Sequence, residues 1–274
     1  MSPEPPPPDL TAPPEPSELM TSPPEPRLPE FDASPQSPPP AAPESYPFWG
    51  YPDLAAFVVI ALFAMIADQL LAAGFLRIVH VKPIFVMLPA QFLLYGFLLW
   101  TLSVIFRRYY GRPFWQSLRW APTGVRASFL AASGVVAALV VMLASVLLRT
   151  PDINSPMKEL LSDKASVMLL AVFGTTLAPL CEELLFRGFL QPLLVRSLGA
   201  VPGVLSAAAA FGLLHLQEYG YSWRHGLLIT LAGAAFGWMR HRTGSTKAAV
   251  VMHAAYNFVF FMLLAAQQAA LHGR

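Results

Sequence analysis

The stretch TTLAPLCEELLFRGFL, residues 175–190, places three charged side chains in one of the most apolar parts of the chain. Glu182 and Glu183 are adjacent, and Arg187 follows four residues after Glu183. A charged side chain at the centre of a membrane helix costs about 2.5–3.5 kcal/mol on insertion scales. Because ionisable residues inside membranes are rare and mark function, this stretch indicates a site within a membrane-embedded helix.

The composition of the whole chain is that of a membrane protein. Of its 274 residues, 55% are hydrophobic and 12% are charged, whereas soluble proteins carry about 25% charged residues. Several apolar runs have the length of about 20 residues that a membrane-spanning helix needs. We therefore predict an all-α, polytopic transmembrane helix bundle of about seven to eight spans. The runs cover residues 54–76, 84–106, 127–148, 165–190, 200–217, 226–240 and 246–266.

The N-terminal part differs from the rest of the chain. Residues 1–46 hold 17 of the 28 prolines, and residues 1–50 hold eight acidic residues and one basic residue, Arg27. With so few large apolar side chains, this segment is predicted to be disordered and partly polyproline II. The domains predicted are a Pro-rich acidic tail (1–46), N-terminal transmembrane helices (47–164) and a catalytic transmembrane core (165–266). The aromatic stretch YPFWGY (46–51) is expected at the water–lipid boundary.

Basic residues predict the orientation of the bundle. With a cytoplasmic N-terminus, 11 Lys and Arg residues lie on the inner side and seven on the outer side, which agrees with the positive-inside rule. The segment FRRYYGRPFWQSLRW (106–120) is then expected to lie at the cytoplasmic surface. We predict an integral protein of the cell (inner) membrane. No basic groove with interleaved aromatic residues is present, so nucleic acid is not an expected partner.

Helix geometry separates the two glutamates. Glu183 and Arg187 share a helical face and can form an ion pair. Glu182 is rotated by about 100° from that face and needs a partner elsewhere. A second apolar run, AAAAFGLLHL, carries Phe211 and His215 one turn apart. Two other residues of these runs are given no catalytic role. The single cysteine, Cys181, is interpreted as a small buried hydrophobic residue. Asp68, in the first run, has no evident partner.

A third run, VVMHAAYNFVFF, carries His253 and Asn257 on one face. Counting at 1.5 Å per residue from the basic ends of their helices, Glu183, His215 and Asn257 lie at depths of ~20, ~22 and ~15 Å. Their similar depths indicate one common site. The small residues Gly233 and Gly237, and the alanines at 207–210, predict close approach of helices nearby.

These side chains suit the hydrolysis of an amide. A carboxylate beside an imidazole can take a proton from water, and a histidine with an asparagine amide can stabilise an oxyanion. The serine-nucleophile motif GxSxG and the zinc motif HExxH are both absent. Zinc is an alternative, because two histidines, a glutamate and a water are a common ligand set. Glu182, His215 and His253 would then be the ligands, and the residues alone leave both chemistries open.

The segments EELLFR, FGLLH and HAAYN, in this order, resemble the signature motifs of the CPBP family. This family contains the type II CAAX prenyl endopeptidases and the bacteriocin-processing Abi intramembrane proteases, and the resemblance covers roughly residues 165–262. It implies a metallo- or a metal-free glutamate protease. Phe211 is expected to contact substrate. The implied catalytic roles are water activation by Glu182 and His215, support by Glu183 and Arg187, and oxyanion stabilisation by His253 and Asn257.

The resulting prediction is an intramembrane endopeptidase that cuts a membrane-embedded or lipid-modified protein near the cytoplasmic side. Its expected partners are the lipid bilayer and this protein substrate. A non-catalytic membrane scaffold, such as a bacteriocin self-immunity protein, is one alternative. A proton-coupled transporter with a Glu/His relay is another, although no inverted repeat is apparent.

Overall fold

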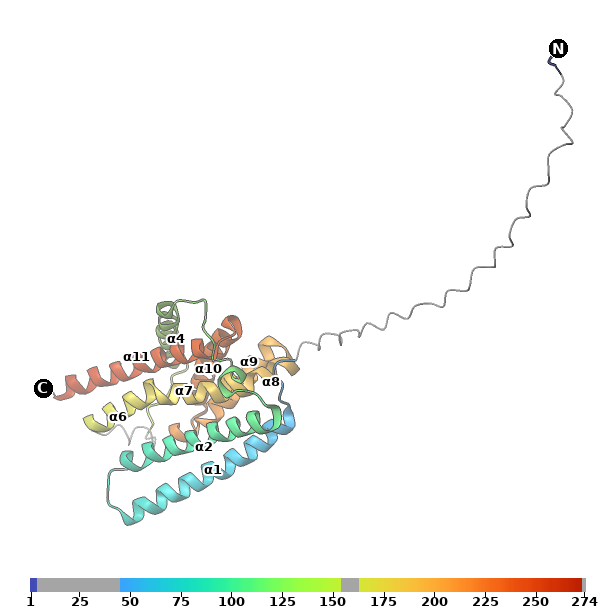
Figure 1. The fold of residues 1–274 in the computed structure, drawn as a ribbon. Helices are drawn as coiled ribbons and strands as arrows, with labels where there is room; N and C mark the ends of the chain where they lie inside the picture. The colour runs from blue at the N-terminus through green and yellow to red at the C-terminus, as the bar shows by residue number, and fades with distance from the viewer. Residues whose placement is uncertain (4–44, 154–162, 273–274) are drawn as a thin grey trace. The chain divides into compact units, whose positions relative to one another are not determined.

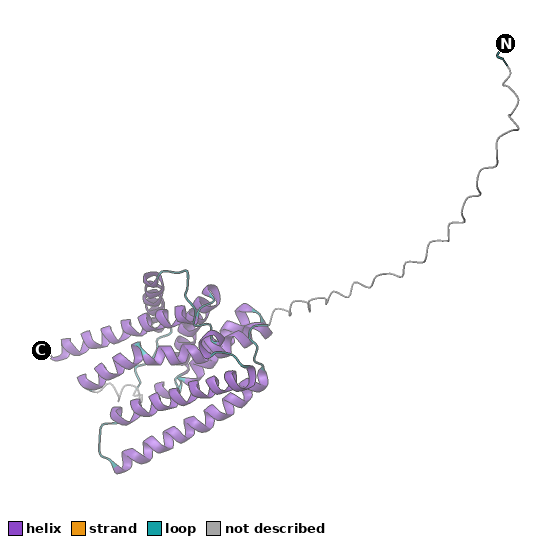
Figure 2. Ribbon diagram, viewed as in Figure 1, coloured by secondary structure: helices purple, strands orange, loops and turns teal. Residues whose placement is uncertain are grey.

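The computed structural model describes residues 1–3, 45–153 and 163–272, with side chains up to residue 267 in the last helix. Residues Glu44–Arg274 form one compact unit. All regular elements in the described residues are helices, and no strand occurs among them, so the predicted all-α class is confirmed (Figure 2). Of the predicted Pro-rich tail, residues 4–44 lie outside the described residues, and its disorder stays a prediction.

Each predicted apolar run corresponds to a helix or to a series of helices. The fourth run, residues 165–190, comprises three consecutive helical pieces, α6, α7 and the π-helix η1, and α8 follows directly after it. The elements in chain order are α1 (Tyr51–Ile78), α2 (Ile84–Tyr110), α3 (Phe114–Ser117), α4 (Ala127–Leu147), α6 (Lys164–Thr175), α7 (Leu177–Glu183), η1 (Leu184–Leu190), α8 (Gln191–Leu198), α9 (Ala200–Leu214), η2 (Gln217–Tyr219), α10 (Trp223–Thr243) and α11 (Thr246–His272).

Five of the described helical segments are long and apolar enough to cross a membrane. They are α1, α2, α4, the series Lys164–Leu198, and Thr246–Gln267 of α11. The shorter helix α9 is also apolar but has 15 residues, or ~22 Å, against a hydrocarbon core of about 30 Å. The last turn of α10 carries Arg240, His241 and Arg242. The chain is therefore an integral membrane protein. Of the predicted runs, the fifth forms the short helix α9, and the sixth forms α10, which is less apolar than the five spanning segments.

The packing of the helices brings the three motif-bearing segments together. Helices α1 and α2 pack side by side, α11 lies along α4 and α6, and α9 packs between α8 and α10 (Figure 1). As a result, α9 with His215 and α11 with His253 both contact the series that carries the two glutamates. The site predicted from depth is therefore compatible with the fold.

Within the aromatic stretch YPFWGY (46–51), Trp49 packs inward and Tyr51 is 49% exposed, and the expected position of the stretch at the water–lipid boundary stays a prediction. The Trp49 side chain is 1% exposed, and its ring stacks on Phe189 with 5.5 Å between centroids. Its indole N–H donates to the Phe189 carbonyl at 3.2 Å, and Arg196 donates to the Trp49 carbonyl at 3.1 Å. Because these protein groups satisfy both the ring and the polar atoms, Trp49 has no need of lipid headgroups.

Helices α4 and α11 approach each other closely at Gly134. A Cβ atom at this position would lie 2.2 Å from the Met252 carbonyl oxygen. We expect Gly134→Ala to lower the stability of the protein by about 1–3 kcal/mol, because the helices must move apart. Thermal unfolding of the purified protein in detergent measures this loss. Gly96→Ala is the matched control, since a Cβ at Gly96 in α2 meets nothing within 4 Å; equal melting temperatures for the two variants would contradict the prediction.

Candidate active site

Glu183 and Arg187 form a fully buried ion pair, as their spacing predicted. The distance from Arg187 Nη1 to Glu183 Oε1 is 3.1 Å, and both side chains are 0% exposed. Arg187 Nη2 also donates to the Gly233 carbonyl of α10 at 2.8 Å. Its guanidinium lies 4.5 Å from the centre of the Phe211 ring of α9. The pair thus connects α7 and η1 to two further helices.

The residues Leu184–Leu190 form a π-helix directly after the two glutamates. Such segments are rare and occur frequently at functional sites. One turn further on, Gln191 Nε2 donates to the Gly237 carbonyl at 2.9 Å, which repeats the contact between Arg187 and Gly233. A Cβ atom would lie 3.0 Å from Arg187 Nη2 at the first glycine and 2.6 Å from Gln191 Oε1 at the second. The predicted close approach at these glycines is present.

His253 lies between the two glutamates. Its Nδ1 is 2.9 Å from Glu183 Oε1, and its Nε2 is 3.9 Å from Glu182 Oε2. Because the Glu183 carboxylate only accepts hydrogen bonds, Nδ1 carries a hydrogen and donates it. The ring is held by Phe236, which stacks on it at 4.4 Å between centroids. The histidine is therefore oriented on both sides, with its Nε2 edge directed to Glu182.

Glu182 has a partner that the helix geometry did not reveal. The Tyr95 hydroxyl of α2 donates to Glu182 Oε1 at 2.7 Å. The Tyr95 ring stacks parallel to Phe173 of α6, with 6.3 Å between centroids and 6° between planes. Glu182 therefore contacts a neutral donor and His253, whereas its neighbour Glu183 takes the arginine.

His215 is held in one tautomer by its own helix. Its Nδ1 is 2.8 Å from the Phe211 carbonyl oxygen, which can only accept, so Nδ1 is the donor and Nε2 is the acceptor. His215 also interacts electrostatically with Glu182 and with Glu218. The Phe211 side chain is 3% exposed and its ring lies 4.3 Å from that of His215; its contact with substrate stays a prediction.

Asn257 contacts the interruption between α6 and α7. Its Nδ2 donates to the Gly174 carbonyl oxygen at 2.7 Å. Close by, Thr176 has φ −127° and ψ −79°, which breaks the helix. A carbonyl at such a break lacks its usual helical donor, and the Asn257 amide supplies one. Of the two amide hydrogens, one is thereby used, and the predicted oxyanion role rests on the other.

The family model described as "Type II CAAX prenyl endopeptidase Rce1-like" matches residues 164–259. Over these residues the chain is similar to the Rce1-like type II CAAX prenyl endopeptidases. Members of the family are intramembrane proteases, and the predicted resemblance to the CPBP family is confirmed. The chain has no significant match among the curated proteins or the solved structures. The matched segment contains all six predicted catalytic residues, Glu182, Glu183, Arg187, His215, His253 and Asn257.

Two residues near the Rce1-like site were missed by sequence reasoning. Tyr95 lies in α2, before the matched segment, within the run QFLLYGFLLW. Nothing in that run distinguishes it, because tyrosines are common in membrane helices. Glu218 in η2 interacts electrostatically with both Glu182 and His215. Its position three residues after His215 was a usable signal, since an acid so near a buried histidine is unusual in an apolar chain.

The zinc alternative required Glu182, His215 and His253 as ligands. Among the residues that the structure describes, no three His, Cys, Asp or Glu side chains are grouped so that they could hold a metal ion. His253 binds Glu183 through Nδ1, and its Nε2 lies 3.9 Å from Glu182. The observed donor set does not fit a zinc site, so we derive no step through a metal.

Proposed function

We propose that the Rce1-like domain hydrolyses a peptide bond of a membrane-embedded or lipidated protein with a water molecule that Glu182 and His215 activate. The observation that carries this proposal is the different pairing of the adjacent glutamates. Glu183 is neutralised by Arg187, whereas Glu182 contacts the neutral Tyr95 hydroxyl and the edge of His253. Glu182 is thus the carboxylate available to take a proton.

The reaction follows from the acceptors at the site. Glu182 accepts a proton from water, whose oxygen attacks the carbonyl carbon of the peptide, with His215 Nε2 as the second acceptor. When both nitrogens of His253 carry hydrogens, Nδ1–H is held by Glu183 and Nε2–H can donate to the developing oxyanion. The proton on Glu182 then passes to the leaving amine. We place the N-terminus and the opening of the site on the cytoplasmic side of the cell membrane, in line with the basic residues.

A reconstituted cleavage assay tests this proposal. The purified full chain in liposomes is mixed with a prenylated peptide that ends in a CAAX sequence, and separately with an unmodified transmembrane peptide. We expect defined fragments by mass spectrometry from at least one peptide. Added hydroxylamine should give no hydroxamate product, because water attacks directly and no acyl-enzyme forms. Hydroxamate formation, or intact peptides in both cases, would argue against the proposed mechanism.

Tyr95 is expected to position Glu182. Tyr95→Phe keeps the ring that stacks on Phe173 and removes only the hydroxyl that binds Glu182. We predict that kcat falls by about tenfold with KM little changed, since a hydrogen bond to a charged group contributes about 1.5–3 kcal/mol. Steady-state kinetics on the cleaved peptide measure the two constants.

Tyr110→Phe is the matched control for this variant. It removes another hydroxyl from the same helix, one that donates to Asp53 Oδ2 at 2.6 Å, far along α2 from Tyr95. This control should keep the wild-type kcat even if its melting temperature falls. A similar loss of kcat in both variants would assign Tyr95 a purely structural role.

A further inference from the structure

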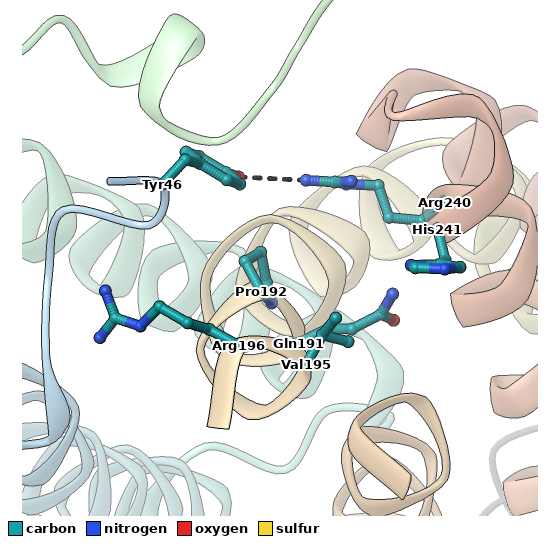
Figure 3. Close-up of a pocket in the computed structure, with 7 residues that line it drawn as sticks. All are labelled: Tyr46, Gln191, Pro192, Val195, Arg196, Arg240 and His241. Carbon is teal, nitrogen blue, oxygen red and sulfur yellow. Dashed lines mark hydrogen bonds between the residues drawn. The ribbon is translucent and has the colours of Figure 1, made fainter. Parts of the chain in front are cut away.

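A cavity of about 260 Å³ lies beside α8, and none of the six predicted catalytic residues lines it. It is bounded by the segment before α1, by α8 and by the end of α10 (Figure 3). Tyr46 and Arg240 are joined by a hydrogen bond on one side of it, and Pro192 of α8 lies beneath them in this view. The residues that line it are Tyr46, Gln191, Pro192, Val195, Arg196, Arg240 and His241.

Arg240 brings a buried positive charge to the wall of this cavity. Its side chain is 8% exposed. Nη2 donates to the Tyr46 hydroxyl at 3.0 Å and Nε donates to Thr246 Oγ1 at 3.3 Å. Both partners are neutral, and within the described part of the chain no carboxylate pairs with Arg240. Buried charges are normally paired. We therefore expect an anion to bind beside this guanidinium.

Two further arginines lie near the segment before α1, and both are exposed. Arg119 lies over the Tyr46 ring at 4.2 Å from its centre. Arg196 donates to the Trp49 backbone carbonyl at 3.1 Å. Neither arginine pairs with a carboxylate among the residues described, and the positive charge of Arg119 repels that of Arg240. Arg119 therefore adds positive charge beside Arg240, and no carboxylate among the described residues pairs with either of them.

The Tyr46 hydroxyl adds a neutral donor to this lining. Burial raises the pKa of Tyr46, so the hydroxyl stays protonated at neutral pH. Its oxygen accepts the hydrogen bond from Arg240, and its own hydrogen is left for donation. Guanidinium and hydroxyl donors together match the unprotonated oxygens of a phosphate, which accept hydrogen bonds.

We propose that this cavity binds a phosphate group, carried by the headgroup of an anionic membrane lipid or by free inorganic phosphate. Its position favours the lipid, because Arg196 and Arg240 lie in the last turns of α8 and α10. Basic pockets between membrane helices at a cytoplasmic surface suit such headgroups. Gln191 of the cavity wall also holds α10 through Gly237, so an occupied cavity should stabilise the packing of α8 on α10.

Thermal unfolding of the purified full chain in detergent tests the proposal. The melting temperature is followed while phosphatidylglycerol, phosphatidylcholine or inorganic phosphate is added, with chloride at matched ionic strength. A ligand that binds the folded state raises the melting temperature as its concentration increases. Tyr46→Phe and Arg240→Gln should weaken the apparent affinity about tenfold each. Arg242→Gln is the matched control, because Arg242 is exposed and does not line the cavity.

The outcomes separate the two sources of phosphate. A rise with phosphatidylglycerol but not with phosphatidylcholine, weakened in Tyr46→Phe and kept in Arg242→Gln, supports the lipid headgroup. A rise with inorganic phosphate that the lipid does not exceed, with the same pattern of variants, supports free phosphate. If Arg240→Gln does not fold, the response of Tyr46→Phe to the ligands is sufficient to test the site. No rise with either ligand, or an equal response of Tyr46→Phe, Arg242→Gln and the wild type, overturns the site.

Discussion

Glu182→Gln is expected to lower kcat for peptide cleavage by about 10²–10⁴-fold, the usual contribution of a general base. Glutamine fills the same volume and its carbonyl oxygen can still accept the Tyr95 hydroxyl bond that Glu182 Oε1 accepts now. It cannot take a proton from water. The melting temperature should therefore stay close to that of the wild type while cleavage is lost. The reconstituted peptide assay and thermal unfolding measure the two quantities on the same preparations.

Asp68→Asn is the control that removes an acid from another membrane helix. Asp68 lies in α1, and no hydrogen bond or ion pair of its side chain occurs among the described residues. We expect wild-type cleavage from this variant, because loss of one partly exposed charge in α1 does not affect the reacting water. If the Glu182→Gln variant keeps more than a tenth of the wild-type kcat, Glu182 is not the general base.

The spacing of residues along the sequence predicted those contacts of the site that form within one helical segment. The interval of four residues predicted the Glu183–Arg187 pair, and the same interval placed Phe211 and His215 together; the structure contains both contacts. The runs of apolar residues likewise predicted the all-helical fold, because burial in lipid leaves few other ways to satisfy the backbone. The periodicity of one helix is sufficient to predict contacts of this kind.

The spacing of residues along one helix could not predict the contacts between different helices. Tyr95 reaches Glu182 only because α2 packs beside α7, and Trp49 is buried only because Phe189 of η1 and Arg196 of α8 contact it. The π-helix after Glu183 also departs from the rotation of about 100° per residue that the sequence argument assumed. Partner choice of this kind depends on helix packing, for which the apolar pattern has no information.

Arg187→Met is expected to destabilise the protein by about 3–5 kcal/mol, the cost of breaking a buried ion pair on one side. The change leaves the Glu183 carboxylate, which is 0% exposed, without its cation. It also removes the donor to the Gly233 carbonyl. Thermal unfolding in detergent measures the loss. Arg108→Met, at the exposed end of α2, should change stability by no more than about 0.5 kcal/mol.

The double variant Glu183→Gln with Arg187→Met distinguishes a structural tie from a catalytic role for this pair. Removing both charges should recover part of the stability, because no uncompensated charge remains buried. Cleavage should remain low in the double variant: the glutamine at position 183 can still accept from His253 Nδ1, but it has no negative charge to balance a His253 ring that carries hydrogens on both nitrogens and donates to the oxyanion. Recovery of stability together with cleavage would make the pair purely structural. Additive losses of stability would instead show that Glu183 and Arg187 do not depend on each other, against the 3.1 Å contact between them.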